Sequence, residues 1–129
     1  EVNEILGVPK RALLRDMFAS IAVRDSSRAL RLVNDLASGG FDQVFAIKML
    51  IQYFRNMLLL RIDPTLAEII KQEMPEEDMV FVAEEGKSFS DLRVKHALST
   101  LIDALMNFKR SPIPQLPLEL ALLEIIQKE

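Results

Sequence analysis

The sequence predicts an all-α fold, a compact bundle of about six or seven helices. Three observations predict it. Apolar residues recur at intervals of three and four along most of the chain. Strand signals, such as alternating Val/Ile/Thr runs and Asn-Gly turns, are missing. Prolines and glycines stand where one helix would stop and another begin, and 129 residues are enough for one domain with its own core.

The first third of the chain predicts two short antiparallel helices. Pro9 suits the first turn of a helix that ends near Arg24. Asp25 or Ser26 can cap the second helix, because a short polar side chain accepts hydrogen bonds from the free amides of a first turn. The pair Gly39-Gly40 then supplies the left-handed stop that follows a helix end.

Residues 42–62 form the longest periodic segment and predict the central helix of the core. This helix carries one broad apolar face and one polar stripe, formed by Lys48, Gln52, Arg55 and Asn56. Asp63-Pro64 then caps and starts another helix, which ends at Pro75. The segment PEEDMVFVAEEG contains MVFV, which a strand could use, but its acidic start and its final glycine favour a short helix.

The last third predicts a long helix, a proline-rich link and a final helix. Ser88 and Asp91 have the spacing of a capping box, and the apolar stripe that follows runs to Lys109-Arg110. The prolines at positions 112, 114 and 117 come next, and proline fixes φ and lacks an amide hydrogen, so it stops one helix and suits the first turn of the next. The final segment, LPLELALLEIIQKE, is apolar on nearly every side and therefore needs more than one neighbour.

Charge and composition argue against several functions. The formal net charge is −3, so no overall field would attract nucleic acid or an anionic membrane. No apolar run is long enough to cross a bilayer, and we expect no membrane contact. The chain has no cysteine, which fits a reducing compartment such as the cytoplasm. It begins at Glu1 and leads straight into VNEIL, so we expect a fragment of a longer protein.

The residues predict no catalytic, metal or cofactor site. The four glycines lack the Lys-Ser/Thr signature of a phosphate-binding loop. The only histidine, His96, has Arg93 three residues before it, where helical di-iron sites use glutamate. His96, Thr100 and Asp103 share one helix face, but a triad must converge on a reacting atom inside a pocket. We interpret these three as a solvated polar stripe, and a small helical enzyme has no constellation to support it.

A locally basic surface in the first third leaves a second class of function open. It comprises Lys10, Arg11, Arg15, Arg24, Arg28 and Arg31. Acidic neighbours dilute this charge, and no aromatic residue interleaves with the basic ones, as stacking on single strands requires. The alternative hypothesis is a helical nucleic-acid-binding domain that contacts phosphates. It would use Arg11, Arg15, Arg28 and Arg31, although we expect no direct DNA contact.

Two stretches of the chain resemble a known family. LIDALMNFKRSPIPQLPLELALLEII resembles the end of the third domain of the bacterial DNA polymerase III gamma/tau subunit, where a helix, a Ser-Pro-x-Pro link and a Leu-Glu-Leu-Ala-Leu-Leu helix follow in this order. Upstream, ILGVPKRALLRDMFASIAVRDSSRALRLVNDLASGGFDQVFAIKMLIQYFRNMLLL is similar to that family's Leu-Gly pair, two short helices, glycine break and long apolar helix. The resemblance covers nearly the whole chain and is least distinctive over PEEDMVFVAEEGKSF.

The resemblance implies a subunit-assembly domain of the replicative clamp loader. In that family the third domain is a helical collar that joins companion subunits in a five-membered ring, and the two domains before it form an ATPase. Residues 1–129 would then be a single collar domain whose partners are delta, delta prime and further gamma/tau copies. ATP and Mg²⁺ would bind only to the missing ATPase domain. The implied location is the bacterial cytoplasm, at the nucleoid-associated replisome.

The apolar last helix, read with this resemblance, predicts a subunit interface. The apolar positions that cannot all face one core are Leu118, Leu120, Leu122, Leu123 and Ile126. Glu119 either complements the start of its own helix or pairs with a cation of a partner. Arg110 similarly either complements the negative end of its own helix or takes part in the interface. We expect no small-molecule ligand at these positions.

Overall fold

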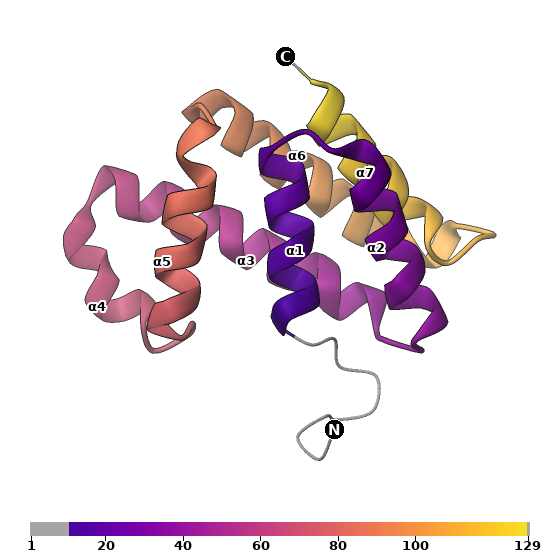
Figure 1. The fold of residues 1–129 in the computed structure, drawn as a ribbon, viewed down its shortest axis with the longest axis horizontal. Coiled ribbons are helices and arrows are strands. Elements are labelled where there is room, and N and C mark those ends of the chain that lie inside the picture. Colours follow the sequence, from indigo (N-terminus) through magenta and orange to yellow (C-terminus); the bar gives the residue numbers. More distant parts are fainter. Residues whose placement is uncertain (1–10, 129) are drawn as a thin grey trace.

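The computed structural model describes residues 11–128, and these residues form a bundle of α-helices without a strand (Figure 1). The all-α prediction is therefore confirmed. Pro9, Lys10 and the Leu-Gly pair before them lie outside the described residues. In chain order, the helices are α1 (Arg11–Ala22), α2 (Ser26–Ser38), α3 (Gln43–Ile62), α4 (Ala67–Ile70), α5 (Glu76–Glu85), α6 (Asp91–Asn107) and α7 (Leu116–Gln127).

Short polar side chains and glycine set several of the helix boundaries, and those of α2 agree with the prediction. Asp25 caps α2 by accepting from the amide of Arg28 at 3.0 Å. Asp42 caps α3 by accepting from two amides of the first turn, which satisfies donors that have no partner inside the helix. Gly40, with φ of +73°, takes the left-handed conformation after α2. The segment after Pro75 is helix α5, as predicted, and not a strand.

The predicted capping box at the start of α6 is wrong. The cap is Ser90, whose side chain accepts from the amide of Arg93 at 3.1 Å. Ser88 belongs instead to the 3-10 turn η2 (Gly86–Ser88) and donates to the carbonyl of Ala22. The side chain of Phe89 is buried in the core between them, so the chain turns inward there and α6 begins only afterwards.

Helix α3 runs through the centre of the bundle, and α1, α5 and α6 pack around it (Figure 1). Four aromatic side chains meet at this centre, with ring centroids 5.0–5.9 Å apart in tilted or edge-on pairs: Phe18, Tyr53, Phe54 and Phe89. Aromatic rings prefer such arrangements, and each buries a large apolar area. The centre of the core therefore joins α1, α3 and the segment just before α6.

The phenol of Tyr53 is buried and is expected to titrate late. Burial raises the pKa of Tyr53 to about 12, and the negative charge of Asp78 adds to this shift. Because the folded pKa exceeds the unfolded value of about 10, its contribution to stability is complete below pH 10 and is lost as the pH rises through 12. Tyr53 is the only tyrosine, so the ultraviolet absorbance of phenolate reports on it alone. If the phenolate titration of the folded protein has its midpoint near that of the urea-unfolded chain, the pKa of Tyr53 is not raised by folding.

Gly86 lies where any larger residue meets the core. A Cβ at this position would lie 2.0 Å from Sδ of Met57, which is itself buried. The substitution Gly86→Ala is therefore expected to lower the free energy of unfolding by about 1–3 kcal/mol, because overpacking displaces neighbouring side chains. Urea unfolding measures this. In a Met57→Ala background the same substitution should cost less, and an equal cost would show that the contact with Met57 is not the cause.

Candidate functional site: the groove between α6 and α7

The proline-rich link turns the chain so that α7 returns alongside α6. Helix α6 passes into the 3-10 turn η3 (Phe108–Arg110), and α7 begins at Leu116 with Pro117 in its first turn. Between them, the hydroxyl of Ser111 donates to the carbonyl of Ile113 at 2.6 Å and accepts from the amide of Ile113 at 3.3 Å. Because prolines cannot donate, this serine fixes the turn with its own side chain.

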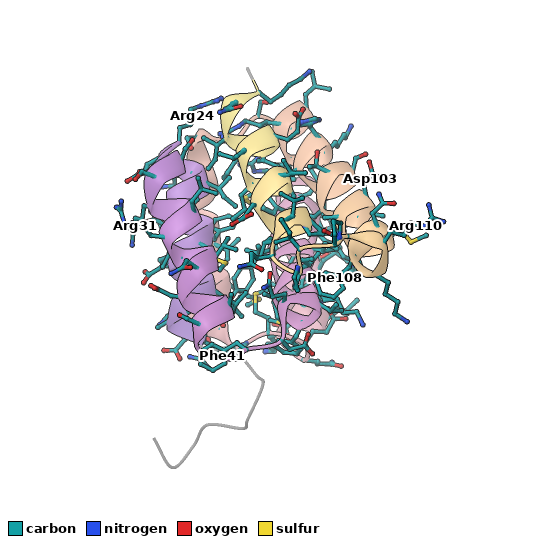
Figure 2. All side chains as sticks on the ribbon, turned by 90° about the vertical axis from the view of Figure 1, so that its right-hand side faces the viewer. Arg24, Arg31, Phe41, Asp103, Phe108 and Arg110 are labelled. Atoms are coloured by element: carbon teal, nitrogen blue, oxygen red, sulfur yellow. The ribbon has the colours of Figure 1, made fainter. Side chains whose placement is uncertain are left out.

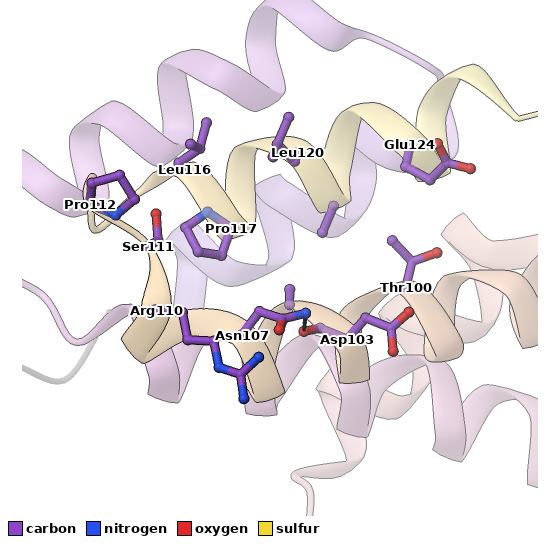
Figure 3. A pocket seen from close by; sticks show the side chains of 12 residues that line it. Thr100, Asp103, Asn107, Arg110, Ser111, Pro112, Leu116, Pro117, Leu120 and Glu124 are labelled. Carbon is purple, nitrogen blue, oxygen red and sulfur yellow. Dashed lines mark hydrogen bonds between the residues drawn. The ribbon is translucent and has the colours of Figure 1, made fainter.

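A groove of about 570 Å³ lies between α6, the link and α7 (Figure 3). Its wall is mostly apolar, with Leu116, Pro117 and Leu120 on the α7 side. Arg110 stands at the link end, whereas Asp103 of α6 and Glu124 of α7 lie farther along the two helices (Figure 3). The groove therefore combines an apolar floor with a cation at one end and carboxylates toward the other.

The structure separates the predicted interface residues into two groups. Leu118, Leu122 and Ile126 are buried in the core of this chain, so they have no area to offer to a partner. Leu120 is 57% exposed and lines the groove. The remaining three lie at intermediate or full exposure: Glu119, Leu123 and Arg110. The expectation of interface area is thus corrected for the three buried residues, because α7 packs on α6, α2 and α1 along that face.

Residues of α6 form the other wall of the groove, and only some of them stand out in the sequence. Thr100 and Asp103 were interpreted as a solvated polar stripe, but they form one wall together with Asn107. Nε2 of His96 lies 3.1 Å from a carboxylate oxygen of Glu124, so this histidine links α6 to α7. The polar spacing on α6 could be read from the sequence, but not the presence of α7 beside it.

Two arginines hold the end of α7 in place. Arg24 donates to the carbonyls of Ile126 and Lys128 at the end of α7, next to which it appears in Figure 2. Arg93 is only 8% exposed, and its guanidinium donates to the carbonyl of Ile21 at 3.2 Å and to that of Ile125 at 3.5 Å. Cations suit the negative ends of helices. Burial lowers the pKa of Arg93, and the charge of Arg24 lowers it further.

Most of the predicted basic surface is engaged within the chain. Arg11 and Arg15 each lie 3.6 Å from the buried carboxylate of Asp78, and Arg28 lies 3.4 Å from that of Asp16. A hydrogen bond to Glu77, followed by the charge of Asp78, raises the pKa of Arg11. Cations that are already paired with carboxylates neutralise fewer DNA phosphates, so fewer counterions are released from the DNA on binding. The nucleic-acid alternative therefore has no specific observation in its favour.

Within residues 11–128, no group of three His, Cys, Asp or Glu side chains could hold a metal ion. None of the helices that the structure describes is both long and apolar enough to cross a membrane.

The structure defines a compact all-α domain that carries an open, mostly apolar surface groove. The family model described as DNA polymerase III subunits gamma and tau domain III matches residues 1–129, and the chain belongs to this family. This confirms the resemblance seen in the sequence and gives the chain a role related to the clamp loader. No curated protein shows significant similarity to it.

Proposed function

We propose that this chain is the collar domain of the replicative clamp loader, which assembles subunits and holds their ATPase modules in a pentameric ring. The ring would load the sliding clamp onto primed DNA in the bacterial cytoplasm. Delta, delta prime and further gamma/tau copies would be the partners, and ATP and Mg²⁺ would bind to other domains. The observation that carries this proposal is the family match over the whole chain.

The surface near the link supports assembly in physical terms. Ile113 of the link and Leu120 of the groove wall are apolar side chains exposed by about half. Exposed apolar side chains that gather around a groove mark a site of interaction, because water is unfavourable around them. Burying them against another subunit would stabilise a ring.

Light scattering over a wide concentration range tests this function. The chain has its own core and can be measured alone, and also mixed with the collar domains of delta and delta prime. We expect mass to rise with concentration, or a mixed oligomer of defined mass to form. A particle that stays monomeric at all concentrations and ignores these partners would contradict the proposal.

Leu120→Asp is expected to weaken this assembly by at least about tenfold without unfolding the domain. Leu120 is exposed, so the change costs within about 0.5 kcal/mol of stability, but it places a charge on the apolar groove. The dissociation constant from light scattering measures the effect. Leu92→Asp is the matched control, because Leu92 is 78% exposed at the start of α6 and does not line the groove. Equal effects of the two variants would show that the groove is not used.

A further inference from the structure

One end of the molecule is strongly acidic. Residues 62–85, which include α4 and α5, hold eight carboxylates and a single lysine. Part of this charge is compensated: Lys71 pairs with Glu68, Arg55 with Glu73, and Arg11 and Arg15 with Asp78. Carboxylates still outnumber the cations at this end, so it favours a cationic partner.

Helix α5 presents the clearest docking face at this acidic end. Glu76, Val80 and Glu84 are spaced by four residues, which places them on one side of the helix. All three are exposed, and Val80 is exposed by 57%. The face thus has an apolar centre between two carboxylates. Lys87 lies 3.2 Å from Glu84, but this pair is exposed and weak, so it can be exchanged for another partner.

The link end carries the complementary features. Residues 104–118 contain Lys109 and Arg110 and no carboxylate. Across the part of the chain that the structure describes, neither cation forms a salt bridge. Leu120 lines the same groove as Arg110, and Ile113 belongs to the link; both are exposed apolar side chains. The carboxylates of Asp103 and Glu124 lie farther along the groove and would repel α5, so the favourable part of this surface is its link end.

These two surfaces lie at opposite ends of the long axis of the bundle, with α4 and α5 at one end and the link at the other (Figure 1). A contact between two different faces of identical chains is heterologous, so each copy can bind one neighbour at each end. Contacts of this kind close into a ring or continue as a filament, whereas a contact between two equal faces stops at a dimer.

We propose that two copies of this chain join head to tail, with the α5 face of one copy docked on the link end of the groove of the next. Val80 meets Ile113 and Leu120, while Glu76 and Glu84 meet Lys109 and Arg110. This proposal rests on the proposed function, because it names the faces through which collar domains of this chain would assemble.

Two charge-reversed variants of the whole chain test it. The first, Lys109→Glu with Arg110→Glu, has two acidic faces, and the second, Glu76→Lys with Glu84→Lys, has two basic faces. Each variant alone should self-associate at least about tenfold more weakly than wild type in light scattering. An equimolar mixture should associate more strongly than either variant alone, because a contact between the α5 face of one variant and the link end of the other pairs opposite charges. Circular dichroism verifies that both variants are folded.

The control variant is Arg31→Glu with Lys95→Glu, which changes net charge as much as the first variant but leaves both faces intact. It should associate like wild type. Association of both reversed variants at wild-type strength would overturn the head-to-tail contact while leaving the proposed function in place. The same holds if wild type assembles only with delta and delta prime collar domains and never with itself. Wild type that assembles with neither would overturn both proposals.

Discussion

Leu122→Ala is expected to lower the free energy of unfolding by about 2–5 kcal/mol, because Leu122 is fully buried on α7 and its loss leaves a cavity. Leu122 belongs to the face of α7 that packs into the core, together with Leu118 and Ile126. A leucine deletion at such a site loses both transfer free energy and packing contacts. Urea unfolding followed by circular dichroism measures the change.

Leu120→Ala serves as the matched control on the same helix. Leu120 is largely exposed, so its truncation should change stability by no more than about 0.5 kcal/mol. The two leucines lie within one turn of each other and share their chemistry. Similar costs for both substitutions would contradict the assignment of one face of α7 to the core and the other to the surface.

Arg93→Met is expected to lower the free energy of unfolding by about 2–4 kcal/mol, since hydrogen bonds from a charged donor contribute more than neutral ones. The guanidinium donates to carbonyls near the ends of both α1 and α7. It also lies 4.3 Å from the centroid of the Phe89 ring, whose π face attracts a cation. The variant also avoids the desolvation cost of a buried charge, which offsets part of this loss of stability. Urea unfolding of the variant measures the net effect.

Arg31→Met is the control for this substitution. Arg31 is exposed on α2, and among the described residues its side chain bonds only to Ser27 one turn earlier, so its replacement should cost within about 0.5 kcal/mol. Arg93→Lys should recover part of the loss, because it keeps the charge but not the planar fork. Stability of Arg93→Met at or above the wild-type value would show that the buried charge costs more than its hydrogen bonds contribute.

The helices themselves could be predicted because their signals are local. Asp25 and Gly40 act within a turn of their own helix, and the sequence shows both of them directly. The choice of helix after Pro75 was also correct, since the acidic first turn complements the helix dipole whatever packs against it.

Features that depend on contacts between helices could not be predicted. Asn56 was placed on the polar stripe of the central helix, but it is buried, and its carbonyl oxygen accepts from Arg55 at 3.0 Å. The acidic start after Pro75 predicts carboxylates that complement the helix dipole, yet one of them, Asp78, is also a buried partner of Arg11 and Arg15. Neither role follows from periodicity, because each requires the position of another helix.

The candidate site shows the same limit. The sequence indicated correctly that α7 is too apolar for one neighbour, but not which residues face the core. Leu118 and Leu122 are buried in the core of this chain, whereas Leu120 is exposed and lines the groove. The groove also needs Asp103 and Asn107 of α6, which come near α7 only after the link has turned.

The most direct test of the collar function is a count of subunits. Native mass spectrometry of this chain, mixed with the collar domains of delta and delta prime, gives the number of each chain in every assembly. We expect a closed assembly of five domains that contains several copies of this chain. Spectra that show only separate monomers, at concentrations where all domains are folded, would contradict it.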